Sequence, residues 1–170
     1  MQEEKTSRSA VHVPADEGRS FWLFTDLHTF KAVSEDTGGA FALEELTAHM
    51  RFAPPPHIHH REDESYYILE GEYEFLIDGR TFTAGPGSFV YMPKGQLHMH
   101  MNAGDTPARA LVLLMPAGVE RFLEEAGEPA TDVSYVPPIP EMPELQRTVE
   151  RAQKYGIEVP PPPDSNEKEL

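Results

Sequence analysis

Histidines and carboxylates form the part of this 170-residue sequence whose residue types and spacing could do chemistry. His57 and His59 are two residues apart, so on a β-strand their side chains would project to the same side. An acidic run at 62–64 follows closely and could bring a carboxylate oxygen to the same point, although spacing alone does not select one of its three members. His98, which opens a predicted strand after a turn, would add a third imidazole. This combination of nitrogen and oxygen donors suits a divalent first-row metal ion.

Such a site would leave part of the metal open. Three nitrogens and one oxygen fill four positions of an octahedral ion, so two neighbouring positions remain for water, substrate or dioxygen. An open metal lowers the pKa of a bound hydroxyl group and orients two reactants side by side. The sequence contains no cysteine, which excludes disulfides, thiolate ligands and a cysteine nucleophile.

Other side chains are candidates for the wall of the site. Alternation along the strands places Tyr66 on the same side as Glu64, and Phe75 lies on the apolar face of the next strand. Met92 is a further candidate, and His100 shares a strand face with His98, where it could support a ligand, line the pocket or fill the core. We therefore predict that the substrate-binding residues are Tyr66, Phe75, Met92 and His100. His60 has the opposite strand parity to His59 and is expected to be exposed. An apolar lining with few polar groups suits a small organic ligand.

The elements that must position these residues are short strands. Alternating apolar and polar residues between turn signals predict an antiparallel all-β protein, a sandwich or barrel. Asp78 and Gly79 favour a two-residue hairpin turn, because both residues tolerate positive φ angles. The expected strands are 20–25, 29–33, 40–48, 49–52, 64–70, 72–77, 80–83, 88–92, 97–102 and 108–115.

Two helices are expected after the strands. The first covers 118–126 and ends at Gly127, with Val119, Phe122 and Leu123 facing the barrel. The second covers 143–155 and ends at Gly156, with an apolar face of Leu145, Val149 and Ala152. The resulting prediction is an N-terminal extension at 1–19, a barrel at 20–127, and a proline-rich linker, helix and tail at 128–170, with both chain ends extended or mobile.

Composition narrows the class of partner. Fourteen Lys and Arg against 29 Asp and Glu give a formal charge of −15, which opposes binding to nucleic acid or to anionic membranes. The first ten residues are polar, and no run of 18 apolar residues occurs. A cytoplasmic protein without a membrane segment is the expectation.

Two stretches of the sequence resemble the two signature motifs of the cupins. His57, His59, Glu64 and Gly71 match the pattern H-x-H-x4-E-x6-G, and the second pattern, G-x5-P-x-G-x2-H-x3-N, is matched by Gly87, Pro93, Gly95, His98 and Asn102. The resemblance implies a double-stranded β-helix, or jelly-roll barrel, that holds one divalent metal ion. It also selects Glu64 from the acidic run, so that the implied ligands are His57, His59, Glu64 and His98.

Within that family the chain looks most like single-domain bacterial cupins described as quercetin dioxygenase-like. The resemblance implies an oxidoreductase that adds dioxygen to a flavonol or another small enolisable aromatic substrate, with Glu64 as catalytic base. The metal could be Ni, Fe, Mn, Co or Zn, and jelly-roll cupins commonly form homodimers. The alternatives are another metal-dependent enzyme, such as an isomerase or decarboxylase, and a cupin that binds metal or a small molecule without catalysis. An intact Glu64 argues against a thiol dioxygenase.

Overall fold

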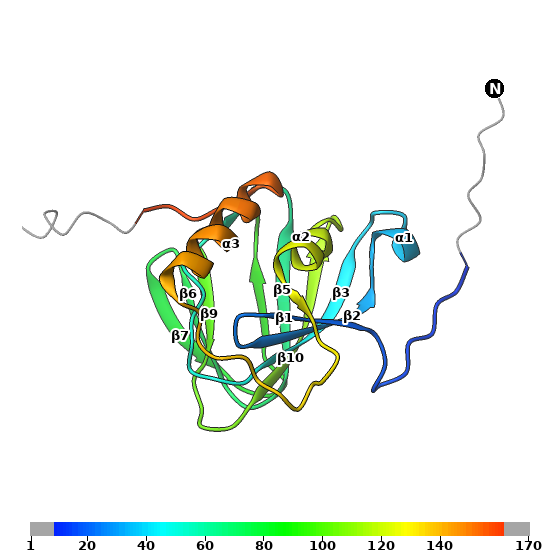
Figure 1. Ribbon diagram of the computed structural model, residues 1–170, viewed down its shortest axis with the longest axis horizontal. Coiled ribbons are helices and arrows are strands. Elements are labelled where there is room, and N and C mark those ends of the chain that lie inside the picture. Colours follow the sequence, from blue (N-terminus) through cyan, green and yellow to red (C-terminus); the bar gives the residue numbers. More distant parts are fainter. Residues whose placement is uncertain (1–8, 162–170) are drawn as a thin grey trace, which may run out of the picture.

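The computed structural model describes residues 9–161, so the expectations for 1–8 and 162–170 lie outside the described residues. Two groups of strands face each other and curve into a barrel (Figure 1). In chain order the strands are β1 (Arg19–Leu23), β2 (Asp26–Ala32), β3 (Ala42–Ala48), β4 (Ile58–His59), β5 (Asp63–Glu70), β6 (Tyr73–Ile77), β7 (Arg80–Ala84), β8 (Phe89–Met92), β9 (His98–Asn102), β10 (Ala108–Met115), β11 (Glu128–Pro129) and β12 (Ile157–Glu158). The helices are α1 (Ser34–Thr37), α2 (Val119–Ala126) and α3 (Met142–Lys154). The predicted all-β jelly roll with short C-terminal helices is confirmed.

The larger sheet has the strand order β11-β1-β2-β3-β10-β5-β8, and a smaller sheet has the order β7-β6-β9. All strand pairs within them are antiparallel. Their inner faces bury the core, in which β3 and β10 alternate strictly between buried and half-buried residues for most of their length. This alternation explains why the period-two pattern in the sequence identified the strands.

Turn residues set the strand register as expected. Asp78 and Gly79 have φ angles of 47° and 78° and join β6 to β7, which confirms the predicted hairpin. Gly71, a position of the first motif, has a φ angle of 71°. A Cβ atom there would lie 2.7 Å from the Cα of Ala108, so only glycine allows β5 to turn this close to β10.

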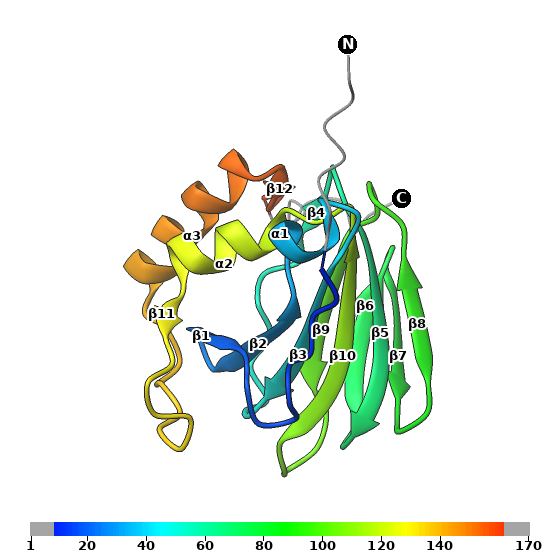
Figure 2. The same cartoon turned by 90° about the vertical axis from the view of Figure 1, so that its right-hand side faces the viewer.

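The helices cover one end of the barrel (Figure 2). Val119, Phe122 and Leu123 of α2 are buried, as predicted from the helical pattern. Glu120 is also buried, and it anchors α1 because its carboxylate accepts hydrogen bonds from the backbone N–H and the hydroxyl of Ser34. The same carboxylate accepts a hydrogen bond from the N–H of Gly118, so one acidic side chain joins the start of α1 to the start of α2.

Some segments differ from expectation. Residues 49–52 were predicted as a strand but are irregular, because they lead into three consecutive prolines that have no N–H to donate to a sheet. The expected strand at 29–33 begins earlier, at Asp26. The short elements α1, β11 and β12 were not predicted. Two-residue strands such as β11 and β12 form only because a distant partner, β1 or β4, lies beside them.

Two further expectations concern a membrane segment and a homodimer. Within the described residues no helix is long and apolar enough to cross a membrane. The predicted homodimer stays a prediction. Strand β8 ends the larger sheet, and Tyr67, Phe89 and Tyr91 expose large apolar surfaces on β5 and β8.

Candidate metal centre

The segment from His57 to His59 carries two of the predicted ligands and is fixed on both sides, with His57 directly before β4 and His59 at its end. The backbone N–H groups of His57 and His98 each donate to the carbonyl of the other residue at 2.9 Å, which joins this segment to β9. On the other side β4 pairs with β12, with His59 opposite Ile157. The segment is therefore held by elements about 40 and 100 residues away in sequence, and its extended backbone places His57 and His59 on the same side.

Four side chains converge at this point, and we call them the metal cluster: His57, His59, Glu64 and His98. One ligand atom from each lies within 4.8 Å of all the others. Nε2 of His98 is 2.9 Å from Oε2 of Glu64, and Nε2 of His59 is 3.9 Å from the same oxygen. His59, Glu64 and His98 are buried. The predicted ligands are thus brought together in one place.

Two of the three imidazoles have an outer hydrogen bond that orients the ring. Nδ1 of His57 donates to the carbonyl of Pro55, and Nδ1 of His98 donates to the carbonyl of Gln96, each at 3.0 Å. These bonds place the ring protons of His57 and His98 on Nδ1 and direct Nε2 toward a metal, as outer partners of metal-bound histidines do. Nδ1 of His59 lies 3.5 Å from a carboxylate oxygen of Glu62 but without hydrogen-bond alignment, so Glu62 is an electrostatic neighbour of this ring.

The cluster fits a divalent cation on the chemistry of its donors. Oε2 of Glu64 and Nε2 of His98 are buried and have no hydrogen-bond partner among the described residues, because their close approach lacks hydrogen-bond alignment. Buried polar atoms without partners are costly, and a cation between them would supply the missing interactions. Three imidazoles and one carboxylate suit Ni, Fe, Mn, Co or Zn alike.

The charges of the metal cluster also suit a cation. Burial alone would raise the pKa of Glu64, but the surrounding imidazoles of His98, His59 and His57 outweigh burial and hold this pKa below its usual range. Burial and the two neighbouring imidazoles lower the pKa of His57 to about 3. At neutral pH the carboxylate is therefore ionised and His57 is neutral, which are the forms that bind metal. Burial would lower the pKa of His98, but the Glu64 carboxylate outweighs burial and raises it.

The acidic run, which spacing alone could not resolve, has three separate roles. Glu64 points into the metal cluster. Glu62 is buried behind His59 and contacts its outer nitrogen. Asp63 accepts a hydrogen bond at 2.9 Å from the backbone N–H of Lys94, which fixes the turn before His98. Sequence reasoning missed the role of Glu62, whose only signal was a carboxylate three residues after His59.

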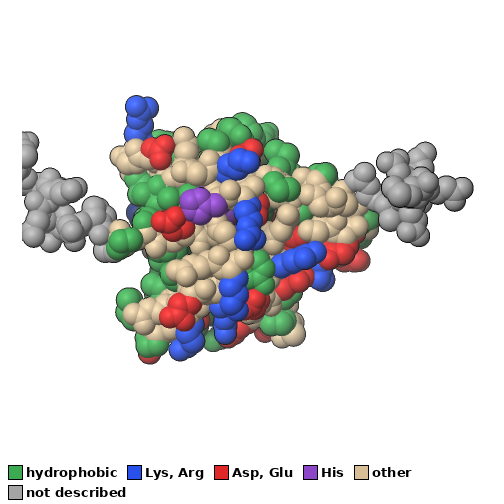
Figure 3. Space-filling model, turned by 90° about the horizontal axis from the view of Figure 1, so that it is seen from above, with side chains coloured by type: hydrophobic (Ala, Val, Ile, Leu, Met, Phe, Trp, Pro, Cys, Tyr) green, Lys and Arg blue, Asp and Glu red, His purple; other side chains and the backbone are tan. Residues whose placement is uncertain are grey.

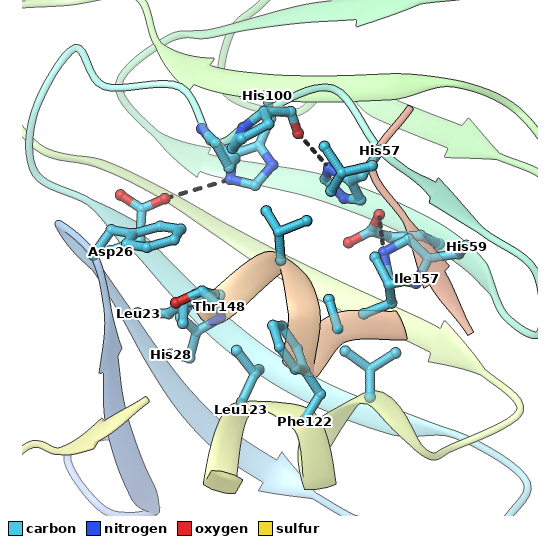
Figure 4. A pocket seen from close by; sticks show the side chains of 18 of the residues that line it. Leu23, Asp26, His28, His57, His59, His100, Phe122, Leu123, Thr148 and Ile157 are labelled. Carbon is cyan, nitrogen blue, oxygen red and sulfur yellow. Dashed lines mark hydrogen bonds and ion pairs between the residues drawn. The ribbon is translucent and has the colours of Figure 1, made fainter. Parts of the chain in front are cut away.

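A cavity of about 110 Å³ adjoins the metal cluster, and Figure 4 shows it from close by. Its wall is mostly apolar and includes Phe122 and Leu123 of α2 and Ile157 of β12. Helix α3 closes the cavity with Leu145, Thr148, Val149 and Ala152. The helix and the strand that follow the predicted barrel therefore complete the pocket.

Of the predicted substrate-binding residues, Tyr66 and His100 line this cavity. The Tyr66 hydroxyl donates to Oε1 of Glu64 at 3.3 Å and lies 3.0 Å from Nδ1 of His100. Nε2 of His100 lies 3.4 Å from a carboxylate oxygen of Asp26. A chain of polar side chains thus connects Asp26 to the metal cluster.

The other predictions for the pocket have different outcomes. Phe75 and Met92 are almost fully buried but do not border the cavity, so they pack in the adjoining core, and their role in substrate binding stays a prediction. His60 is exposed and pairs with Glu158 at 2.7 Å. Sequence reasoning missed Asp26, His28 and Glu44, which line the cavity from β2 and β3.

Residues 48–114 match the family model described as Cupin domain. The chain is 40% identical over 81 residues to the dimethylsulfoniopropionate lyase DddQ of Ruegeria pomeroyi, which covers 45% of this chain and 40% of the lyase. It is 25% identical over 122 residues to the quercetin 2,3-dioxygenase of Bacillus subtilis, covering 71% of this chain and 36% of the dioxygenase. The chain thus spans about two fifths of the length of these two relatives.

Solved structures show the same fold at low sequence identity. KdgF from Halomonas sp. aligns with a TM-score of 0.59 and 15% identity, covering 66% of this chain and 99% of that structure. A structure from Thermotoga maritima described as a predicted oxalate decarboxylase aligns with a TM-score of 0.58 and 20% identity, covering 62% and 99%. The chain therefore has the cupin fold, matches the Cupin domain model over residues 48–114, and is distantly similar to quercetin 2,3-dioxygenase and dimethylsulfoniopropionate lyase.

Proposed function

We propose that this cupin is a metal-dependent enzyme that removes a proton from a small enolisable substrate, with Glu64 as the base. The finer form of the proposal is a dioxygenase, in which dioxygen reacts with the substrate anion that Glu64 generates. The position of Glu64 carries the proposal, because its carboxylate belongs to the metal cluster, lines the cavity and is ionised at neutral pH.

The size of the cavity indicates the size of the substrate. Its volume of about 110 Å³ is smaller than the roughly 150 Å³ of an engineered cavity that holds benzene. A three-ring flavonol is larger than this volume. Hydroxy-ketones and hydroxy-acids of a few carbon atoms fit as the structure stands, and the apolar wall suits their carbon chains.

The residues around the cavity divide the work of proton removal. A divalent metal in the cluster would lower the pKa of a hydroxyl or carbonyl-adjacent C–H group of the substrate. Glu64 accepts the proton, and the Tyr66 hydroxyl holds Oε1 of this carboxylate in place. His100 and Asp26 in turn orient Tyr66. The apolar side chains of α2 and α3 exclude water from the substrate anion.

Hydrogen–deuterium exchange tests the proton-removal step without knowledge of the final product. Hydroxyacetone, dihydroxyacetone and acetoin would be incubated without oxygen in D2O with the Ni, Fe, Mn, Co and Zn forms, and their C–H signals followed by NMR. We expect exchange with at least one metal, and its loss in Glu64→Gln measured at a metal concentration that fills the site. Absence of exchange with every metal and substrate, despite bound metal, would favour the non-catalytic alternative.

Oxygen consumption tests the dioxygenase form. The distant similarity to quercetin 2,3-dioxygenase supports it. The same substrates and a flavonol would be compared in air, with oxygen uptake measured by an electrode. We expect uptake with the small substrates to exceed uptake with the flavonol. Exchange without any oxygen uptake would reject the dioxygenase and leave an isomerase, decarboxylase or lyase.

A lyase is the second candidate, because the identity to the dimethylsulfoniopropionate lyase reaches 40% over 81 residues. Elimination from a sulfonio-propionate also begins with removal of the proton next to the carboxylate, which the same base could perform. Incubation with dimethylsulfoniopropionate, followed by NMR for olefinic protons, checks this candidate. Absence of olefinic product with all five metal forms would exclude it.

A further inference from the structure

A second group of ionisable side chains lies on the opposite side of the cavity from the metal cluster. Asp26 and His28 project inward from β2 and Glu44 from β3, and we call these three residues the β2–β3 cluster. Figure 4 shows Asp26 and His28 across the cavity from His57 and His59. All three residues are buried, with exposed fractions of 6%, 8% and 3%. They are not explained by the metal cluster, to which none of them belongs.

The positions of these residues are ones at which a barrel core normally carries apolar side chains. Along β3 the inward residues are Ala42, Glu44, Leu46 and Ala48, so a carboxylate interrupts an apolar row. Burying a charged group costs free energy unless partners satisfy it. The β2–β3 cluster therefore requires an explanation in terms of its partners.

The partners within the protein satisfy only part of this cluster. Nδ1 of His28 donates to Oε1 of Glu44 at 3.0 Å. Oε2 of Glu44 is buried and has no hydrogen-bond partner among the described residues. The contact of Asp26 with Nε2 of His100, at 3.4 Å, likewise lacks hydrogen-bond alignment, and the imidazole nitrogen is left without another partner in that part of the chain. Acceptor capacity thus remains unused beside the cavity.

The charge of the β2–β3 cluster favours a donor as the missing partner. Burial lowers the pKa of His28, but Glu44 outweighs burial and raises it, which favours the form of the imidazole that donates to Glu44. The cluster contains two carboxylates but only this one imidazole, and Oε2 of Glu44 still has no donor among the described residues. A second metal ion does not fit, because in the described part of the chain only the residues of the metal cluster come close enough together to hold one.

We propose that the β2–β3 cluster is a substrate subsite in which Glu44 accepts a hydrogen bond from a hydroxyl or ammonium group. The substrate would then have two polar ends, a carboxylate or carbonyl oxygen at the metal cluster and a hydrogen-bond donor at Glu44, joined by a short apolar chain against α2 and α3. This inference rests on the proposed function, and it narrows the substrate to small hydroxy-acids or amino-acids and their carbonyl relatives.

A matched set of ligands tests the subsite by binding alone. Butanoate, 3-hydroxypropanoate and 3-aminopropanoate have the same number of heavy atoms but end in a methyl, a hydroxyl or an ammonium group. Their affinities for the zinc-loaded protein would be measured by titration calorimetry, together with the corresponding series one carbon longer. We expect at least one donor-bearing acid to bind about tenfold more tightly than its methyl counterpart.

Variants at Glu44 test whether this residue causes the preference for donor-bearing acids. Glu44→Gln keeps an acceptor oxygen but removes the charge, so it should abolish the preference for ammonium and weaken that for hydroxyl. Glu44→Leu should abolish both. The control is Glu45→Gln, the next residue on β3, whose half-buried side chain pairs with Arg109 away from the cavity and should leave all affinities unchanged. If Glu44→Leu does not fold, Glu44→Gln still decides the question.

The outcomes separate this proposal from the proposed function. Equal binding of the methyl, hydroxyl and ammonium acids would overturn the subsite and leave the metal centre intact. A donor preference that persists unchanged in Glu44→Gln and Glu44→Leu would also overturn it. A protein that binds zinc but none of the acids would overturn the subsite, whereas the proposed function fails only if deuterium exchange is absent with every metal and substrate.

Discussion

The metal cluster and the β2–β3 cluster use the same side chains, imidazoles and carboxylates, on opposite walls of one cavity. In the metal cluster the three outer ring nitrogens face backbone carbonyls or Glu62, so the inner nitrogens are left pointing at one point. In the β2–β3 cluster Nδ1 of His28 donates to Oε1 of Glu44, and the atom without a partner among the described residues is Oε2 of Glu44. The comparison teaches that the outer partners decide whether a buried polar group can bind a cation or a donor.

Separate substitution of two histidines on the same face of β9 should give the largest difference between the metal cluster and the opposite wall of the cavity. We expect His98→Gln to lower metal affinity by at least about 100-fold, because it removes a ligand. His100→Gln, two residues along β9, should retain the metal within a few-fold while turnover falls, since His100 contacts Tyr66 and Asp26. Metal titration with a competing chelator measures both variants. Equal loss of metal in the two would contradict the separation of the walls.

Removal of an outer partner should have the next largest effect. Glu62→Gln leaves every ligand in place but weakens the support of His59 Nδ1, so we expect metal affinity to fall roughly 10- to 100-fold. The same chelator titration gives the result. Glu72→Gln, an exposed carboxylate at the turn after β5, is the matched control. An affinity equal to that of the wild type would show that Glu62 does not orient His59.

Tyr66 connects the metal cluster to the opposite wall of the cavity, and its hydroxyl should affect turnover rather than metal binding. Tyr66→Phe removes the hydroxyl that bonds Glu64 and His100, so we expect kcat to fall roughly tenfold or more, with metal affinity within a few-fold of the wild type. The rate of deuterium exchange at saturating substrate measures the effect. Tyr67→Phe, on the exposed side of the same strand, should leave the rate unchanged.

The pH dependence of stability should give the smallest effect and comes from the β2–β3 cluster. Since the folded-state pKa of His28 is raised above about 6.5, its interaction with Glu44 stabilises the protein fully below that pH. This stabilisation is lost as the pH rises through the folded-state pKa. Thermal unfolding of metal-free protein between pH 6 and 9 should therefore show a decline that is reduced in His28→Gln. His60→Gln, at an exposed histidine, should retain the wild-type decline.

The face of the molecule that carries α2 and α3 shows no comparable separation of charged groups. Seen from the end that carries α2 and α3, acidic, basic and hydrophobic side chains are intermingled, and no single-sign patch stands out on this face (Figure 3).

The metal cluster could be predicted from two kinds of signal. Strand parity places His57 and His59 on one side next to an acidic run, and the resemblance to the cupin motifs selects Glu64 from that run and adds His98 as the fourth ligand. The strands of the barrel were predicted from short-range signals, since alternation and glycine turns act over a few residues. The acidic run shows the limit of this approach, because only the fold shows that Glu62 lies behind His59 and Glu64 in front of it.

The sequence by itself determined the antiparallel strands, from short-range alternation, and the four residues that could hold a metal, from their match to the cupin motifs. Only the tertiary structure decided what faces that site. Glu44 and His100 lie far in sequence from Asp26 and His28, and β12 forms only where β4 lies beside it. Their meeting depends on how two sheets and two helices pack around one cavity, and no local pattern encodes that arrangement.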